Sequence, residues 1–217
     1  MVSGKPRKEM PRPAPRLCVR VSRVEDPSIF ARDFATMLGG VDVAAVLLRL
    51  PEAGERSMIE RAKVIAPVVQ SKGIALILDG HPDLVARAGA DGAHLTGLAA
   101  FTAAFDMLKP ARIAGAGGLM TRHDAMVAAE KGADYVMFGE PEPDGRRPDF
   151  AAIVERVAWW AELFESPCVG FAGDLDEVAA LAAAGADFVA IDVVATEESF
   201  LIHAAAERLQ AESIRCG

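Results

Sequence analysis

Arginine and carboxylate side chains stand at or near the ends of several short apolar runs in this 217-residue chain, and these are the residue types that could bind a charged ligand. Arg49 and Asp79 end two such runs, and Arg146 and Arg147 lie in a polar segment that follows a third. A guanidinium group binds phosphate through paired N–H groups, and a carboxylate can hold a divalent cation. The residue types therefore predict a site for a phosphorylated ligand, provided that the fold brings them together.

Eight apolar runs alternate with eight amphipathic or Ala-rich segments, and this alternation decides where those residues lie. The apolar runs are at about 17–22, 42–49, 74–78, 92–95, 111–115, 134–139, 168–172 and 187–192, and the helical segments are near 28–38, 55–72, 83–89, 98–108, 121–131, 150–166, 174–184 and 196–211. Continuous apolar strands that alternate with helices indicate a parallel sheet covered by helices. Eight such units in about 200 residues predict a closed (βα)8 TIM barrel, with an open doubly wound sheet as the alternative.

The tripeptide Gly-Ala-Asp occurs three times, at 89–91, 132–134 and 185–187, each time after an Ala-rich stretch and before an apolar run. A glycine at the end of a helix supplies the left-handed residue that terminates it. Each copy is therefore predicted to be a joint between a helix and the following strand. Repetition of such a joint supports the barrel.

In a barrel, the residues that do chemistry lie at the carboxyl ends of the strands. This rule selects the following candidates: Arg20, Ser22, Arg49, Asp79, His81, His94, Thr96, Gly115 to Gly118, Glu140, Glu142, Arg146, Arg147, Gly173, Asp174 and Asp192. Residues 139–149 form the longest irregular segment, which we expect to act as a lid or a ligand clamp. The alternative is that these charges pair with each other and only keep the rim solvated.

Three features among these candidates have a specific expected role. The glycine-rich turn that includes Gly115 and Gly117 could expose backbone N–H groups to a phosphate, or could simply shorten a connection. His94 lies within an apolar run, where a core histidine hydrogen-bonded to the backbone is the expected state. Asp174 and Glu177 have the spacing of a capping box at the start of a helix.

The composition of the chain limits its possible membrane segments, domains and partners. The chain is 52% hydrophobic but has no uncharged apolar run long enough to span a bilayer, so we expect no membrane segment. Residues 1–16 hold five basic residues, one acidic residue and four prolines, and are predicted to be a flexible tail that precedes a single barrel domain at 17–217. The rest of the chain is acidic, which argues against nucleic-acid or anionic-membrane partners.

The three cysteines indicate the redox environment of the chain. Cys18, Cys168 and Cys216 lack the spacing of a metal site, and they fit a reducing cytoplasm. Cys18 and Cys168 lie in apolar runs and are expected to be buried thiols. Self-association into a homo-oligomer stays open.

Several stretches resemble the thiamine phosphate synthase and thiazole tautomerase family. They are VLLR ending at Arg49, LILDGHPDLVARAGADGAHL at 76–95, AAEKGADYVMFGE at 128–140 and AALAAAGADFVAI at 179–191. The resemblance covers residues 17 to about 200. It implies a (βα)8 barrel and, for the synthase, a transferase that joins a pyrimidine diphosphate to a thiazole phosphate with Mg²⁺ and releases diphosphate.

The resemblance also implies site residues. It places the phosphate-binding arginine of the second strand at Arg49, the metal-binding aspartate at Asp79, the diphosphate-binding position after the fifth strand at Gly117 beside Gly115, the lid at Gly139, Arg146 and Arg147, and the thiazole phosphate turn at Gly173. Other family positions fall on Leu47, Leu78, Gly97 and Ala99, and the acid/base histidine of the tautomerases falls on Leu119.

At these positions the chain has apolar or small residues in place of the family's polar ones. This difference leads to three hypotheses. The first is a divergent barrel that has a degraded synthase site and binds a small phosphorylated or thiamine-related ligand. The second is an active thiamine phosphate synthase in which Arg49 and Arg147 grip diphosphate and Asp79 holds Mg²⁺. The third is a non-catalytic regulatory or structural barrel, in which Leu47, Leu78 and Leu119 would fill the mouth.

Overall fold

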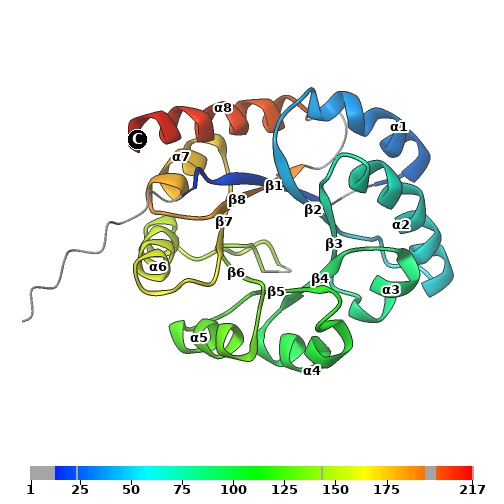
Figure 1. Ribbon diagram of the computed structural model, residues 1–217, viewed down its shortest axis with the longest axis horizontal. Helices are drawn as coiled ribbons and strands as arrows, with labels where there is room; N and C mark the ends of the chain where they lie inside the picture. Colours follow the sequence, from blue (N-terminus) through cyan, green and yellow to red (C-terminus); the bar gives the residue numbers. More distant parts are fainter. Residues whose placement is uncertain (1–12, 23, 143, 194–198, 217) are drawn as a thin grey trace, which may run out of the picture.

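The computed structural model describes residues 13–22, 24–142, 144–193 and 199–216, in which eight parallel strands form a closed ring (Figure 1). The strands are β1 (Arg16–Val21), β2 (Val43–Leu48), β3 (Ala75–Asp79), β4 (Gly92–Thr96), β5 (Ile113–Gly117), β6 (Tyr135–Phe138), β7 (Cys168–Ala172) and β8 (Phe188–Val193). Each strand pairs with the next, and β1 pairs with β8, where Arg20 is opposite Asp192. The predicted (βα)8 barrel is confirmed, and the open doubly wound sheet is wrong.

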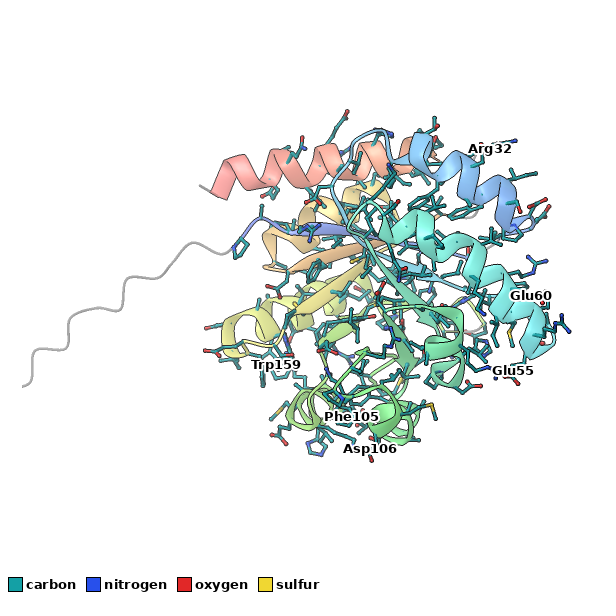
Figure 2. The ribbon with its side chains drawn as sticks, turned by 45° about the vertical axis from the view of Figure 1, so that its right-hand side comes forward. Arg32, Glu55, Glu60, Phe105, Asp106 and Trp159 are labelled. Atoms are coloured by element: carbon teal, nitrogen blue, oxygen red, sulfur yellow. The ribbon has the colours of Figure 1, made fainter. Side chains whose placement is uncertain are left out.

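Helices surround this ring on its outer side (Figure 1). They are α1 (Pro27–Leu38), α2 (Glu55–Gln70), the 3-10 turn η1 (Pro82–Leu84) with the short α3 (Val85–Ala88), α4 (Leu98–Leu108), α5 (Arg122–Lys131), α6 (Phe150–Leu163), α7 (Leu175–Ala183) and α8 (Ser199–Cys216). The side chains of Arg32, Glu60 and Asp106 are exposed on the outer surface of this helical layer (Figure 2). No helix in the described part of the chain is long and apolar enough to cross a membrane.

The amino-terminal boundary differs slightly from the prediction. Arg16, which we predicted to be the last residue of the tail, is the first residue of β1, and its guanidinium group forms an ion pair with Asp42 at 2.7 Å. Residues 1–12 of the predicted tail lie outside the described residues.

The three Gly-Ala-Asp joints do more than end helices. Their glycines have positive φ angles of 73°, 105° and 93°, as the prediction requires. The aspartates Asp91, Asp134 and Asp187 accept hydrogen bonds from the backbone N–H groups of Leu76, Ala114 and Cys168 at 2.8, 2.7 and 2.8 Å. Each joint therefore ties the start of one strand to the start of the strand before it, which helps to fix the ring.

Two layers of apolar side chains fill the molecule. The outer layer lies between strands and helices and contains Trp160, together with Leu78 and Leu119. The inner layer lies within the ring and consists of Cys18, Leu47, Ile77, Met137, Val169, Phe171 and Ala190. Burial raises the pKa of the Cys18 thiol to about 12, so this cysteine behaves as a small apolar side chain, as predicted.

Candidate functional site at the carboxyl ends of the strands

Arg49 and Asp79 meet at the ends of β2 and β3. The Nε and one Nη atom of Arg49 each lie 2.8 Å from Oδ2 of Asp79. The Asp79 side chain is nearly buried, whereas about half of the Arg49 side chain is exposed. The fold therefore brings the two predicted site residues together and leaves part of the guanidinium group open to the mouth of the barrel.

A buried cluster of three polar side chains lies beside this pair. His94 on β4 has its Nε2 atom 2.8 Å from Oε2 of Glu140 and its Nδ1 atom 3.0 Å from the hydroxyl oxygen of Tyr135. The prediction that His94 bonds to the backbone is wrong, because side chains hold both ring nitrogens. Tyr135 begins β6 and Glu140 follows it, so His94 reaches past β5 to contact them.

Glycines on β5 make this reach possible. A Cβ atom on Gly115 would lie 2.1 Å from Cζ of Tyr135, and one on Gly117 would lie 2.4 Å from Nε2 of His94 and 2.5 Å from Oε1 of Glu140. Only a strand without side chains at these two inward positions lets β4 and β6 exchange hydrogen bonds across it. We predicted that Gly115 and Gly117 contact phosphate, whereas the space beside their Cα atoms is taken by the cluster.

The electrostatics of the cluster favour a charged pair. Burial opposes the charge on the imidazole, but the neighbouring Glu140 carboxylate raises the pKa of His94 above its usual value. Burial likewise opposes ionisation of Glu140, but His94, Arg20 and Arg49 lower its pKa. Burial raises the pKa of Tyr135 strongly, so its hydroxyl group stays neutral. These shifts favour the form in which an imidazolium lies between a carboxylate and a neutral phenol.

A second arginine–aspartate pair lies on β1 and β8. One Nη atom of Arg20 donates to Oδ2 of Asp192 at 2.8 Å, and the guanidinium carbon lies 4.5 Å from the centre of the Phe171 ring. The Arg20 side chain is 5% exposed. Among the residues that the structure describes, Nε of Arg20 and Oδ1 of Asp192 are buried without a hydrogen-bond partner.

The segment 139–149 lies after β6, as predicted, and Arg147 ties it to β7 and α7. Arg147 donates to the carbonyl oxygens of Gly139 at 2.8 Å and Phe171 at 2.7 Å, and to the carboxylate of Glu177 at 3.0 and 3.3 Å. Gly139 has a φ angle of 90° and supplies the bend at which the segment begins. The guanidinium group thus anchors the segment.

The other predicted residue of this segment lies elsewhere. The side chain of Arg146 is mostly exposed and forms ion pairs with Asp144 and Glu142 within the segment. Arg146 therefore pairs with other residues than Arg147 and Arg49 do, and its side chain stays at the surface.

Gly173 and Asp174 shape the turn between β7 and α7. The Asp174 side chain accepts from the backbone N–H groups of Asp176 and Glu177, so it caps α7 as predicted. The Glu177 carboxylate does not complete the expected capping box; it accepts from the N–H of Gly173 at 2.6 Å. The role of Glu177 as the partner of Arg147 was not apparent from the sequence.

The donor set for a metal ion is small. The described residues include no group of three or more His, Cys, Asp or Glu side chains placed to hold a metal. Asp79 offers one carboxylate, and Mg²⁺ is commonly held by one or two carboxylates together with water and substrate phosphate oxygens. A site with Asp79 as its protein ligand therefore fits Mg²⁺ that arrives with a phosphorylated substrate.

Some functional candidates could be found from the sequence and others could not. The rule of strand ends located Arg20, Arg49, Asp79, Glu140 and Arg147. Tyr135 was missed because it lies at the start of a strand, where the rule predicts no chemistry. Its one available signal was strand periodicity, which puts it on the same inward face as Met137.

The chain is therefore a closed (βα)8 barrel, a class whose active sites lie at the carboxyl ends of the strands, and it presents arginines, carboxylates and a buried histidine there. The family model described as thiamine monophosphate synthase matches residues 24–193, and the chain belongs to this family. Its membership agrees with the resemblance seen in the sequence.

Individual relatives support the same conclusion. The thiamine-phosphate synthase of Rhodospirillum centenum is 41% identical over 174 residues, which are 76% of this chain and 82% of that protein. The thiamine-phosphate synthase of Hyphomonas neptunium is 33% identical over 192 residues, or 83% and 86% of the two chains. The solved thiamine phosphate pyrophosphorylase of Pyrococcus furiosus superposes with a TM-score of 0.73 and 21% identity, over 91% of this chain and 96% of that one, and shares the fold.

Proposed function

We propose that this chain is a thiamine phosphate synthase, a transferase that couples a pyrimidine diphosphate to a thiazole phosphate. In this reaction the thiazole nitrogen forms a bond to the pyrimidine carbon that carries diphosphate, and diphosphate leaves with the electron pair of the broken C–O bond. The observation that carries the proposal is the 41% identical relative, of whose length this chain covers most. It favours the active synthase over the degraded site that the sequence alone suggested.

Arg49 is the cation placed to receive the leaving diphosphate. Its guanidinium group is half exposed at the mouth, and Asp79 fixes its orientation from the next strand. An oriented donor aimed at developing negative charge contributes roughly 2.7 to 4 kcal/mol to the stability of a transition state. Asp79 would hold Mg²⁺, which when bound neutralises negative charge on the diphosphate.

We assign the Glu140 carboxylate, which His94 holds in place, to the nitrogenous part of the substrate. Oε2 of Glu140 is bonded to His94, and Oε1 is buried without a partner among the described residues. This free oxygen can accept an N–H group of a nitrogenous substrate. A fixed carboxylate also stabilises the positive charge that develops on carbon as diphosphate departs.

The direct test mixes the purified protein with pyrimidine diphosphate, thiazole phosphate and Mg²⁺ and measures thiamine phosphate by chromatography. We expect turnover on the order of 1 s⁻¹. Arg49→Ala should lower kcat by about 10²- to 10³-fold. Arg56→Ala, which removes an exposed arginine on α2, is the matched control and should leave kcat unchanged. Absence of product, or an unchanged kcat for Arg49→Ala, would overturn the proposal.

A second candidate is the ligand-binding barrel without synthase chemistry. It is favoured by one observation, which is that protein carbonyl and carboxylate groups already occupy the N–H groups of Arg147. If no thiamine phosphate forms, calorimetry with the pyrimidine diphosphate, a thiamine-related phosphate that the Arg49–Asp79 pair would bind, decides this case. Arg49→Ala and Asp79→Ala should then weaken binding. The non-catalytic barrel named three leucines as the filling of the mouth. Leu47 lies in the inner apolar layer within the ring, whereas Leu78 and Leu119 pack between strands and helices, so two of the three do not fill it.

We also propose, from the composition and the cysteines, that the protein works in the cytoplasm. Its proposed partners are small phosphorylated molecules.

A further inference from the structure

A cavity of about 250 Å³ lies beside the ends of β1, β7 and β8. Its lining includes Arg20, Arg147, Phe171, Gly173, Asp174 and Asp192. The Arg49–Asp79 pair, at the ends of β2 and β3, is not part of this lining. Two guanidinium groups, the start of α7 and the carboxylates of Asp174 and Asp192 border the cavity. Asp192 is paired with Arg20 and Asp174 caps α7, so Arg147 and the N–H of Gly173 are the donors that an anion could take.

The carboxylate of Glu177 occupies the hydrogen-bond donors of two residues that line this cavity, Arg147 and Gly173. It accepts from the backbone N–H of Gly173 at 2.6 Å and from two Nη atoms of Arg147 at 3.0 and 3.3 Å. Its side chain is 15% exposed. An arginine fork combined with a backbone N–H at a helix start is a donor set that proteins use for phosphate. A carboxylate of the chain itself therefore holds phosphate-type donors.

The donors do not depend on Glu177 for their position. Arg147 stays anchored by the carbonyl oxygens of Gly139 and Phe171, at 2.8 and 2.7 Å. The start of α7 stays capped by Asp174, whose side chain accepts two backbone N–H groups at 2.9 and 3.0 Å. The Glu177 side chain can rotate away while both donors keep their places.

A second observation in the same cavity points to a ligand with oxygen acceptors. Arg20 is 5% exposed, and its Nε–H has no partner among the residues that the structure describes. Buried guanidinium N–H groups are normally satisfied. An acceptor that enters the cavity would satisfy this one, and Glu177 does not. Oδ1 of Asp192 is likewise buried without a partner among the described residues, and a hydroxyl group of a singly protonated phosphate would satisfy it.

We propose that Glu177 is a built-in competitor for phosphate, which holds the donors of Arg147 and Gly173 until a phosphate monoester displaces it and enters the cavity. The competition weakens phosphate binding, and it adds selectivity because a ligand must also satisfy Arg20 to gain from displacing the carboxylate. The inference deepens the proposed function, since the phosphate of one substrate would occupy this place. Its test needs no turnover.

The test compares phosphate affinity in matched variants. Glu177→Ala removes the carboxylate that accepts hydrogen bonds from Arg147 and Gly173. Asp176→Ala is the control, because it removes an equal charge from the same turn of α7, where the Asp176 side chain is 89% exposed. Calorimetric titration uses inorganic phosphate, and then thiazole phosphate, at constant ionic strength. A hydrogen bond to a charged group contributes about 1.5 to 3 kcal/mol, and about 1.4 kcal/mol is a tenfold change in affinity. Glu177→Ala should therefore bind inorganic phosphate and thiazole phosphate at least about tenfold more tightly than the natural protein. Asp176→Ala should match the natural protein.

A milder variant keeps the test decisive if Glu177→Ala fails to fold. Glu177→Gln keeps the length of the side chain and one acceptor oxygen but loses the charge, so we expect a smaller gain in phosphate affinity in the same direction. Replacement of Arg147 by Gln in either background should abolish the gain. Equal phosphate affinity in the folded Glu177 variants and the natural protein would overturn the inference, even with normal synthase turnover. A gain without synthase turnover would overturn only the proposed function.

Discussion

Replacement of Glu140 by Gln tests the charge of the buried cluster. The His94 and Glu140 side chains are 1% and 8% exposed, so solvent screens their interaction weakly. The His94 pKa is raised from about 6.5, so its part of the stabilisation is present below that pH and is lost as the pH rises through the folded value. The Glu140 pKa is lowered from about 4.5, so its part is present above that pH and is lost as the pH falls through the folded value.

The two contributions overlap between about pH 4.5 and 6.5, where the pair should stabilise the protein most. A hydrogen bond between charged groups contributes about 1.5 to 3 kcal/mol, so Glu140→Gln should lower the free energy of unfolding by that amount near pH 5.5. Well above the folded pKa of His94 the difference should shrink to about 1 kcal/mol, because a neutral histidine bonds to Gln almost as well.

Urea unfolding followed by tryptophan fluorescence measures this difference, since Trp160 is fully buried. A chain of this size loses about 2 to 4 °C in Tm per kcal/mol, which gives a second readout. Glu60→Gln is the control, because Glu60 lies on the surface of α2 in an exposed pair with Arg56 and should leave stability unchanged. An equal loss of stability at pH 5.5 and pH 8.5, or a His94 pKa below 6.5 by NMR titration, would refute the charged pair.

Three further predictions concern the frame of the site. Gly115→Ala should lower the free energy of unfolding by about 1 to 3 kcal/mol, because the added Cβ would lie 2.1 Å from Tyr135. Gly54→Ala is the control, because a Cβ there would have no atom within 4 Å. Equal stability of the two variants in urea would contradict this reason. Cys18 has a pKa of about 12 and is therefore a neutral thiol at pH 8, so it should resist iodoacetamide in the native protein. Mass spectrometry measures the labelling. Labelling of Cys18 without unfolding would argue against its burial. Asp187→Ala leaves the first backbone N–H of β7 without its acceptor and should cost about 1 to 3 kcal/mol in urea unfolding. Asp187→Asn keeps an acceptor oxygen and should recover most of the loss, and no recovery would exclude this hydrogen bond as the cause.

The order of elements could be predicted because it depends on local patterns. Apolar runs of strand length, glycines that end helices and the cap at Asp174 each act within a few residues. The parallel pairing of neighbouring units then follows from the alternation of strand and helix. The start of β1 was placed one residue late, because the pairing of Arg16 with Asp42 depends on the neighbouring strand.

The polar site was only partly predictable. Arg49 and Asp79 were found because each ends its own strand, and the barrel rule brings such ends together. The cluster of His94, Tyr135 and Glu140 joins three positions up to 46 residues apart, and it depends on the empty inward face of β5. No local pattern encodes that a missing side chain on one strand lets the strands on either side of it make contact.

By itself the sequence determined the ring of eight units, its family and the set of side chains at the rim, because periodicity, caps and strand ends are properties of short segments. The tertiary structure alone decided the pairing of those side chains: Arg147 with Glu177, Arg20 with Asp192, and His94 with Glu140. The physical reason is that a charge in a narrow, poorly solvated ring must take the partner that lies within hydrogen-bonding distance, and distance across the ring is set by the closed sheet.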